Sequence, residues 1–413
     1  MRVILIPIGS AGDVFPFLGL GQRLAARGHE IVVITNGHFR GLVESLGFAY
    51  DEFGSDEQYR QALNNPDLWH PVKGFKTVMA MLADQAGLMG SIRDHLTPDT
   101  VVVAHSLAFA AMILQEKEHV PVVSLTLQPA LLRSLDGGPV MMGNHGITRW
   151  PRPVRRAFWW LADRLVIDPL MAKIVDPLRD ECGLPRVRRF FKQWIFSPRL
   201  NIGMFPDWYA PPQPDWPANT HLTGFPLCDA FDPAIPPELE ALLTRGDRPI
   251  VFTAGTANIH AQRFFEAAAD ACRRLGRPGI LLTRYRQQIP TDLPPGVRHF
   301  DFAPLSRILP RCGALVHHGG IGTTAAGFAG GVPQVVMPLS HDQPDNAARV
   351  VRLGAGDRLW PKRFTGPNLA ACLQPLLVSS EVAARCTDYA QRCAQVDALG
   401  EATSLIERAA ARD

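Results

Sequence analysis

The stretch Leu315-Val-His317-His318-Gly319-Gly320-Ile321-Gly322-Thr323-Thr324 joins an apolar run to two histidines, several glycines and two hydroxyl residues. The pattern predicts a buried strand that turns into the start of a helix. Glycines leave the backbone N–H groups of a helix N-terminus uncovered, and such groups bind anions. A histidine at the end of the strand adds a hydrogen-bond donor. The stretch therefore indicates an anion site.

A second polar strand end, Pro338-Leu-Ser-His341-Asp342-Gln343, follows along the chain. Its side chains suit the hydroxyl groups of a sugar, whereas the glycine turn suits a diphosphate. Together the two loops indicate a nucleotide-sugar site.

Length and composition limit the possible classes of protein. At 413 residues the chain exceeds one ordinary core, which favours two domains. A 46% apolar fraction, a 20% charged fraction and a net charge of +3 are typical of a soluble globular protein without a nucleic-acid footprint. Seven scattered cysteines without a Cys-x-x-Cys pair indicate reduced thiols in a cytosol. Residues 3–8 are typical of a buried strand and not of a signal peptide, and no run has the roughly 18 apolar residues of a membrane span.

Strand and helix patterns alternate along the chain, as they do in doubly wound parallel sheets. In the first half we expect strands at residues 3–8, 31–35, 101–104 and 122–127, and helices at 17–27, 39–46 and 107–118. In the second half we expect strands at 249–253, 280–283, 315–317 and 334–338, and helices at 262–275, 323–329 and 381–411.

These patterns predict an α/β protein of two Rossmann-like, doubly wound domains with a cleft between them. The predicted parts are a first domain of residues 1–210, a proline-rich linker of 211–245, a second domain of 246–380, and C-terminal helices of 381–413 that pack back on the first domain. Ligands of such sheets bind outside the carboxyl ends of the strands, where the polar motifs of this chain lie.

Four segments in this order resemble the nucleotide-sugar glycosyltransferases of the GT-B fold, in the branch that acts on glycopeptide antibiotics, macrolides, sterols and plant metabolites. They are Gly9-Ser-Ala-Gly12-Asp13-Val-Phe-Pro16, Phe252-Thr-Ala-Gly255-Thr256, Phe302-Ala303-Pro304 through Gly320, and Gly331-Val-Pro333 through Gln343. A closer likeness is to the rhamnosyltransferase catalytic chains of rhamnolipid synthesis, carried by the first segment and by Phe205-Pro-Asp-Trp-Tyr-Ala-Pro-Pro212, Thr223-Gly-Phe-Pro-Leu227 and His341-Asp-Gln-Pro-Asp-Asn346.

Asp13 is the predicted catalytic base. Sugar transfer to a hydroxyl requires removal of a proton, and a positioned carboxylate can accept it. From spacing alone, Asp13 could equally cap a helix that starts near Pro16. It could also act as a nucleophile that forms a covalent sugar intermediate. The resemblance favours the base and a single inverting displacement.

The resemblance implies a set of donor-binding residues. His317 is expected to hold the diphosphate with the helix start that follows it, whereas His318 has a packing or orienting role. Phe302 and Ala303 correspond to the place where relatives stack the base, and Asp342 and Gln343 to the readers of the hexose. The remaining predicted donor contacts are Gly12, Gly255, Thr256, Gly319, Gly320, Ile321, Gly322 and Thr323.

Phe15, His105 and Trp159 are the predicted acceptor contacts. Residues 149–160 and 186–196 mix arginines with aromatic rings, which suits an amphiphilic acceptor or contact with an anionic bilayer. The alternative for each segment is an amphipathic helix with its apolar face in the core and its basic face in solvent.

The predicted activity is inverting, metal-independent transfer of a hexosyl group from UDP-glucose or dTDP-rhamnose to a lipid-like hydroxy-fatty-acid or an aromatic aglycone. The chain has no Asp-x-Asp motif to hold a metal on the diphosphate, so no metal or other cofactor is expected. We expect a cytoplasmic protein that contacts the inner-membrane surface transiently and binds no nucleic acid. The alternatives are a sugar-nucleotide epimerase of the same fold and a non-catalytic nucleotide-sugar-binding partner protein.

Overall fold

The computed structural model describes the whole chain except residues 71–72, 141–146, 148–149, 229–233 and 412–413. It divides into two compact units. Unit 1 contains Met1–Leu68, Val72–Pro226 and Asp397–Asp413, and unit 2 contains Trp69–Pro71 and Leu227–Val396. Each unit is described by itself.

Unit 1 is built on a seven-stranded parallel sheet. Its strand order is β3 (Ala49–Glu52), β2 (Glu30–Thr35), β1 (Arg2–Ile6), β4 (Val101–His105), β5 (Val122–Thr126), β6 (Leu200–Gly203) and β7 (Thr220–Leu222). The central strands are buried along most of their length, as expected for a sheet covered on both faces. The strand order reverses at β1 and β4, and such a reversal opens a ligand site at the carboxyl ends of the two strands.

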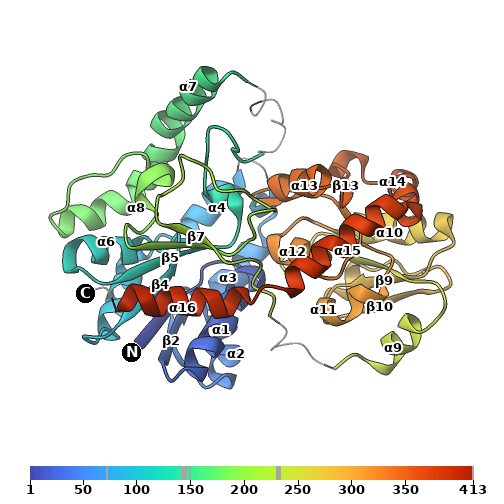
Figure 1. Cartoon of the computed structure of the whole chain (residues 1–413), viewed down its shortest axis with the longest axis horizontal. Coiled ribbons are helices and arrows are strands. Elements are labelled where there is room, and N and C mark those ends of the chain that lie inside the picture. The colour runs from blue at the N-terminus through green and yellow to red at the C-terminus, as the bar shows by residue number, and fades with distance from the viewer. Residues whose placement is uncertain (71–72, 141–146, 148–149, 229–233, 412–413) are drawn as a thin grey trace. The chain divides into compact units, whose positions relative to one another are not determined.

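The helices of unit 1 follow the strands in the alternating pattern that the sequence predicts. They are α1 (Ala11–Ala26), α2 (Arg40–Ser45), α3 (Asp56–Asn64), α4 (Lys73–Met81), α5 (Gln85–Asp94), α6 (Phe109–Glu118), α7 (Arg152–Ala162), α8 (Asp168–Glu181) and α16 (Ala398–Ala410). Two π-helical segments, η5 (Asp163–Ile167) and η6 (Phe190–Trp194), accompany them. In Figure 1 the green helix α7 lies at the edge of unit 1, away from β4 and β5.

Unit 2 repeats the plan with six parallel strands. The order is β10 (Val297–Phe300), β9 (Gly279–Leu282), β8 (Ile250–Thr253), β11 (Ala314–His317), β12 (Gln334–Val336) and β13 (Gly356–Arg358). Its helices are α9 (Pro237–Leu243), α10 (Gln262–Leu275), α11 (Leu305–Ile308), α12 (Ile321–Ala329), α13 (Gln343–Arg352), α14 (Gly366–Val378) and α15 (Ser380–Ala394). Here the order reverses at β8 and β11, so the turns after these two strands are neighbours.

The C-terminal helices are shared between the units. Helix α15 packs on α12 in unit 2, whereas α16 packs on α1 in unit 1 (Figure 1). Glu407 of α16 accepts hydrogen bonds from Arg27 at 2.7 Å and from His29 at 2.9 Å. Only the second part of the predicted segment 381–413 therefore packs on the first domain.

Unit 1 also extends beyond the predicted boundary at residue 210. It continues to Pro226 because β7 pairs with β6 and adds a last parallel strand to the sheet. Among the described residues, no helix has both the length and the hydropathy needed to cross a membrane.

Candidate active site

Asp13 lies in the first turn of α1, directly after β1 at the point where the strand order of unit 1 reverses. Its Oδ2 accepts hydrogen bonds from the backbone N–H of Ser10 at 2.9 Å and from the Ser10 hydroxyl at 3.3 Å. No described residue donates a hydrogen bond to Oδ1. The capping alternative and the catalytic prediction are thus compatible, because one carboxylate oxygen holds the turn and the other keeps its acceptor capacity.

The backbone before Asp13 is shaped to admit its carboxylate. Gly9 has a φ of +136°, and a Cβ on it would lie 2.2 Å from Asp13 Oδ2. Burial raises the pKa of Asp13 to about 6, and the two hydrogen bonds from Ser10 oppose that rise. Asp13 is therefore a stronger base than an ordinary aspartate, and it is still ionised at neutral pH.

The predicted acceptor contacts lie in different parts of unit 1. Phe15 is a partly buried residue of α1, and His105 ends β4 next to β1. His105 is 3% exposed, and burial lowers its pKa to about 4. Its Nδ1 accepts a hydrogen bond from the Leu107 N–H at 3.3 Å, so the neutral ring carries its proton on Nε2, which is buried and has no partner. Trp159 instead lies on α7 and is buried against the Arg133 guanidinium, 4.6 Å from the ring centre.

His317 ends β11 and is fully buried. Its Nδ1 accepts a hydrogen bond from the Gly319 N–H at 3.1 Å, and its Nε2 donates to Gln334 Oε1 at 3.0 Å. Burial is the main reason that its pKa falls to about 3. Both ring nitrogens are therefore used to order the turn in this structure, and the direct contact of His317 with a diphosphate stays a prediction.

His318 lies between the two glycine turns of unit 2. A Cβ on Gly255, whose φ is +88°, would approach within 2.6 Å of this ring, and so would a Cβ on Gly320. Burial lowers the pKa of His318 to about 4, and its Nδ1 is buried without a partner. The neutral ring thus lies against both turns that the sequence predicts to bind phosphate, and its packing or orienting role stays a prediction.

The N-terminus of α12 is open. Gly320 is its N-cap residue and provides no side chain to satisfy the first N–H groups of the helix. A Cβ on Gly322 would meet no atom within 4 Å, and Thr323 is partly buried in the same turn. These backbone N–H groups and the positive end of the helix dipole can bind an external anion.

Asp342 and Gln343 mark the start of α13 in a strained loop, since His341 has a φ of +58°. Gln343 is 3% exposed, and its Oε1 accepts hydrogen bonds from the Leu339 and Ser340 N–H groups. Asn346 Nδ2 donates to Asp342 Oδ2 at 2.7 Å and to the Gly319 carbonyl at 2.8 Å. This amide joins the predicted sugar loop to the glycine turn, so the structure brings these two motifs together.

Most of the other predicted donor residues lie at the same edge of the sheet of unit 2. Gly255 and the exposed Thr256 follow β8, the strand that pairs with β11. Phe302 is partly buried after β10, and Ala303 is 3% exposed. Gly12 is exposed in α1 of unit 1 and thus belongs to a different unit from these residues.

Sequence analysis missed two residues that hold this edge together, Gln334 and Asn346, both 0% exposed. The signal for Asn346 was its position one helical turn after Asp342. The signal for Gln334 was a polar residue at the start of an otherwise apolar strand. The described residues contain no cluster of three potential metal ligands, and the predicted independence from metal still requires an experiment.

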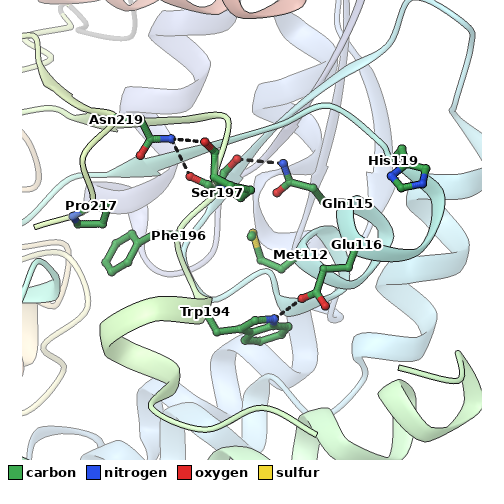
Figure 2. A pocket seen from close by; sticks show the side chains of 10 residues that line it. Met112, Gln115, Glu116, His119, Trp194, Phe196, Ser197, Pro217 and Asn219 are labelled. Atoms are coloured by element: carbon green, nitrogen blue, oxygen red, sulfur yellow. Dashed lines mark hydrogen bonds between the residues drawn. The ribbon is translucent and has the colours of Figure 1, made fainter. Parts of the chain in front are cut away.

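A cavity of about 450 Å³ lies elsewhere in unit 1 (Figure 2). Its lining comes from α6 and from the segments that lead into β6 and β7, with Trp194, Phe196 and Ser197 among the residues that Figure 2 labels. Figure 2 also shows the hydrogen bonds from Gln115 to Ser197 and from Trp194 to Glu116. Because these segments precede their strands, the cavity lies at the opposite edge of the sheet from Asp13.

Two family descriptions match the chain. Residues 3–134 match the glycosyltransferase family 28 N-terminal domain, and residues 280–396 match the erythromycin biosynthesis protein CIII-like C-terminal domain.

Curated relatives match over nearly the whole length. The chain is 28% identical to O-mycaminosyltylonolide 6-deoxyallosyltransferase of Streptomyces fradiae, with 98% of this chain and 97% of the relative covered. It is 29% identical to 4′-demethylrebeccamycin synthase of Lentzea aerocolonigenes, with 98% and 99% covered.

Solved structures share the fold. The glycotransferase of kitacinnamycin superposes with a TM-score of 0.76 at 21% identity, covering 99% of this chain and 98% of the other. The glycosyltransferase VinC in complex with dTDP gives 0.67 at 22% identity, with both chains fully covered. The spinosyn rhamnosyltransferase SpnG gives 0.70 at 18% identity, covering 98% of this chain and all of the other.

The two parallel-sheet units and these matches define the class of the protein, which is the GT-B enzymes. The chain is a nucleotide-sugar glycosyltransferase of this fold. Both alternatives, the epimerase and the non-catalytic partner, are set aside because the matched relatives are transferases.

Proposed function

We propose that the protein transfers a hexosyl group, glucose or rhamnose, from a UDP- or dTDP-sugar to a hydroxyl of a lipid-like or aromatic aglycone acceptor. In this proposal the reaction inverts the anomeric centre and uses no metal. The observation that carries it is the Asp13 carboxylate, which lies at the strand-order reversal of unit 1 with a pKa of about 6 and one oxygen outside the capping contacts.

Asp13 would take the proton of the acceptor hydroxyl as that oxygen attacks the anomeric carbon, while the bond to the diphosphate breaks. The leaving diphosphate gains negative charge. The open N-terminus of α12 and the neutral ring of His318 provide preorganised donors for it, and Asp342 and Gln343 would contact the sugar hydroxyls.

The acceptor and donor classes are supported by the names of relatives. One relative is a deoxyallosyltransferase of O-mycaminosyltylonolide, and one structural neighbour was solved with dTDP. Phe15 and His105 are the proposed acceptor contacts, since Phe15 lies in the helix that follows β1 and His105 ends β4, the two strands at the reversal. We further propose that the protein is cytoplasmic and meets its amphiphilic acceptor at a membrane surface.

A mass-spectrometric transfer screen tests this proposal. UDP-glucose, UDP-N-acetylglucosamine and dTDP-rhamnose are each combined with hydroxy-fatty-acid and phenolic acceptors, with and without EDTA. We expect a glycosylated product from one donor, unchanged by EDTA, whose anomeric configuration by NMR is opposite to that of the donor. Retained configuration would overturn the single displacement, and loss of activity in EDTA would overturn the metal-free mechanism.

A further inference from the structure

Exposed apolar side chains gather on one element of unit 1. Among the described residues ten large apolar side chains are exposed, and six of these lie between residues 150 and 166. They are Trp150, Val154, Trp160, Leu161, Leu165 and Val166, with exposed fractions from 38% to 63%. We call these six residues the α7 face, because α7 and η5 carry all of them except Trp150, which directly precedes the helix.

The inner side of the same helix is held by a buried ion pair and by the buried ring of Trp159. Asp163 and Arg133 are both about 8% exposed and form two hydrogen bonds, at 2.8 and 2.6 Å. The Arg133 guanidinium also covers the buried ring of Trp159. A buried ion pair of this geometry fixes the rotation of the helix about its axis. Helix α7 therefore buries Trp159 and an ion pair on its inner side, while its other large aliphatic side chains and Trp160 remain exposed.

The exposed charge around the α7 face is mainly positive. Arg152, Arg156 and Arg164 are exposed, whereas Asp163, the acidic residue of α7 and η5, is buried. The exposed Asp136 pairs with Arg152 at 2.7 Å and lies 3.7 Å from Arg155, so the positive charge of Arg156 and Arg164 remains in excess. The Arg164 guanidinium lies 5.8 Å from the ring centre of Trp160, so a cation and an amphipathic aromatic ring are presented together.

We propose that the α7 face docks on an anionic lipid bilayer and lies in the plane of the interface. Sixteen residues of α7 and η5 form a rod of roughly 24 Å. Leu161 and Leu165 enter the acyl boundary, Trp160 lies at the headgroup level, and the arginines contact anionic headgroups. A second copy of the chain fits less well, because a two-fold interface would place the arginines of one face against those of the other.

This inference deepens the proposed membrane contact, and it rests on the exposed surface of α7 rather than on catalysis. It can therefore fail while the transferase assignment stands. The readout is binding to vesicles, with an unchanged thermal unfolding curve as the check that the variants are folded.

The test compares the full-length protein on vesicles of phosphatidylcholine and of phosphatidylcholine with phosphatidylglycerol. The main variant is Leu161→Gln with Leu165→Gln, which leaves the charge unchanged. The second variant is Arg156→Gln with Arg164→Gln, which leaves the apolar side chains unchanged. The matched control is Val378→Gln, which changes a residue in unit 2 that is 76% exposed.

We expect the unchanged protein to sediment with the anionic vesicles and to be released by high salt. The leucine variant should bind about tenfold more weakly, and the control should bind as the unchanged protein does. The arginine variant should lose the preference for phosphatidylglycerol.

The proposal would be overturned if the leucine variant bound the anionic vesicles as tightly as the unchanged protein. It would also be overturned if the unchanged protein bound both kinds of vesicle equally. If analytical ultracentrifugation instead showed a dimer that the leucine variant dissociates, the occupant would be a second copy and the bilayer assignment would be wrong.

Discussion

The turn after β1 in unit 1 and the turn after β11 in unit 2 have the same plan, in which a buried strand runs through glycine into a helix at a reversal of strand order. They differ in what lies at the helix N-terminus. In α1 the chain supplies its own carboxylate, Asp13, whereas in α12 the N-cap residue is Gly320 and the position is left open. One local geometry thus holds an internal anion, the proposed base, in unit 1 and leaves the corresponding position open to an external anion in unit 2.

The largest expected effect comes from changing the internal anion. Asp13→Asn keeps an oxygen that can accept from the Ser10 N–H but removes the base. We expect kcat to fall by about 10²–10⁴-fold with dTDP or UDP binding unchanged. Asp94→Asn, at an exposed position of α5, is the matched control. Near-normal transfer by the Asp13 variant would show that Asp13 is not the base, so the turn after β1 would have no role in proton transfer.

A smaller effect is expected when the open turn is filled. In Gly320→Ala the new Cβ would lie 2.6 Å from His318 Nε2, so the ring or the turn must move. We expect the Kd for dTDP or UDP to rise at least about tenfold in calorimetry. Gly41→Ala in α2 of unit 1 is the control, because its Cβ also meets no atom within 4 Å and Gly41 is not a predicted donor contact. Equal effects of the two substitutions would mean that the open N-terminus does not hold the diphosphate.

The pH dependence of the transfer rate tests the proposed role of Asp13 in a second way. As the proposed base, Asp13 would act when ionised, and its pKa is about 6, so the rate should fall as pH decreases through that value. At pH 5 we expect about a tenfold loss of kcat/KM relative to the plateau. His317 and His318 have pKa values of about 3 and 4, so they stay neutral over this range. A profile that is flat from pH 5 to 8 would contradict the role of Asp13.

The smallest effect is expected from Ser10→Ala. This change removes the weaker of the two hydrogen bonds to Asp13, at 3.3 Å, and keeps the backbone bond at 2.9 Å. Because the hydroxyl lowers the pKa of Asp13, its loss should move the acidic limb of the rate profile slightly upward. A shift toward lower pH would show that the Ser10 hydroxyl does not stabilise the carboxylate.

The sequence was sufficient to predict the central strands of both sheets, because continuous apolar runs mark strands that are buried on both faces. It did not predict the edge strands β3, β7, β10 and β13, which are short and not fully buried. It also missed β6, which is fully buried but has only four residues, with Asn201 and Gly203 among them. The start of α1 was also missed by six residues. Its first turns contain Gly12, Asp13 and Pro16, which interrupt the helical spacing of apolar residues.

Sequence could locate the site turns but not the directions of their side chains. The sequence alone does not show how the side chains of His317 and His318 differ in direction. In the structure the His317 ring is hydrogen-bonded to Gln334. The His318 ring instead lies against Gly255 and Gly320. The same limit applies to α7, for which sequence left open an apolar face in the core or one in contact with an acceptor or bilayer. Only the structure shows that Trp159 and the Arg133–Asp163 pair lie inward, and this pair joins residues 30 positions apart.

The contact between α16 and α1 has a consequence for biosynthesis. Arg27 and Glu407 are 380 residues apart, so unit 1 is complete only when nearly all of this sequence has left the ribosome. Unit 2 lies almost entirely within residues 227–396 and can complete its core earlier. The half that is begun first would therefore be finished last, and released chains truncated after Val396 should show a protease-resistant unit 2 while α1 still lacks its partner helix.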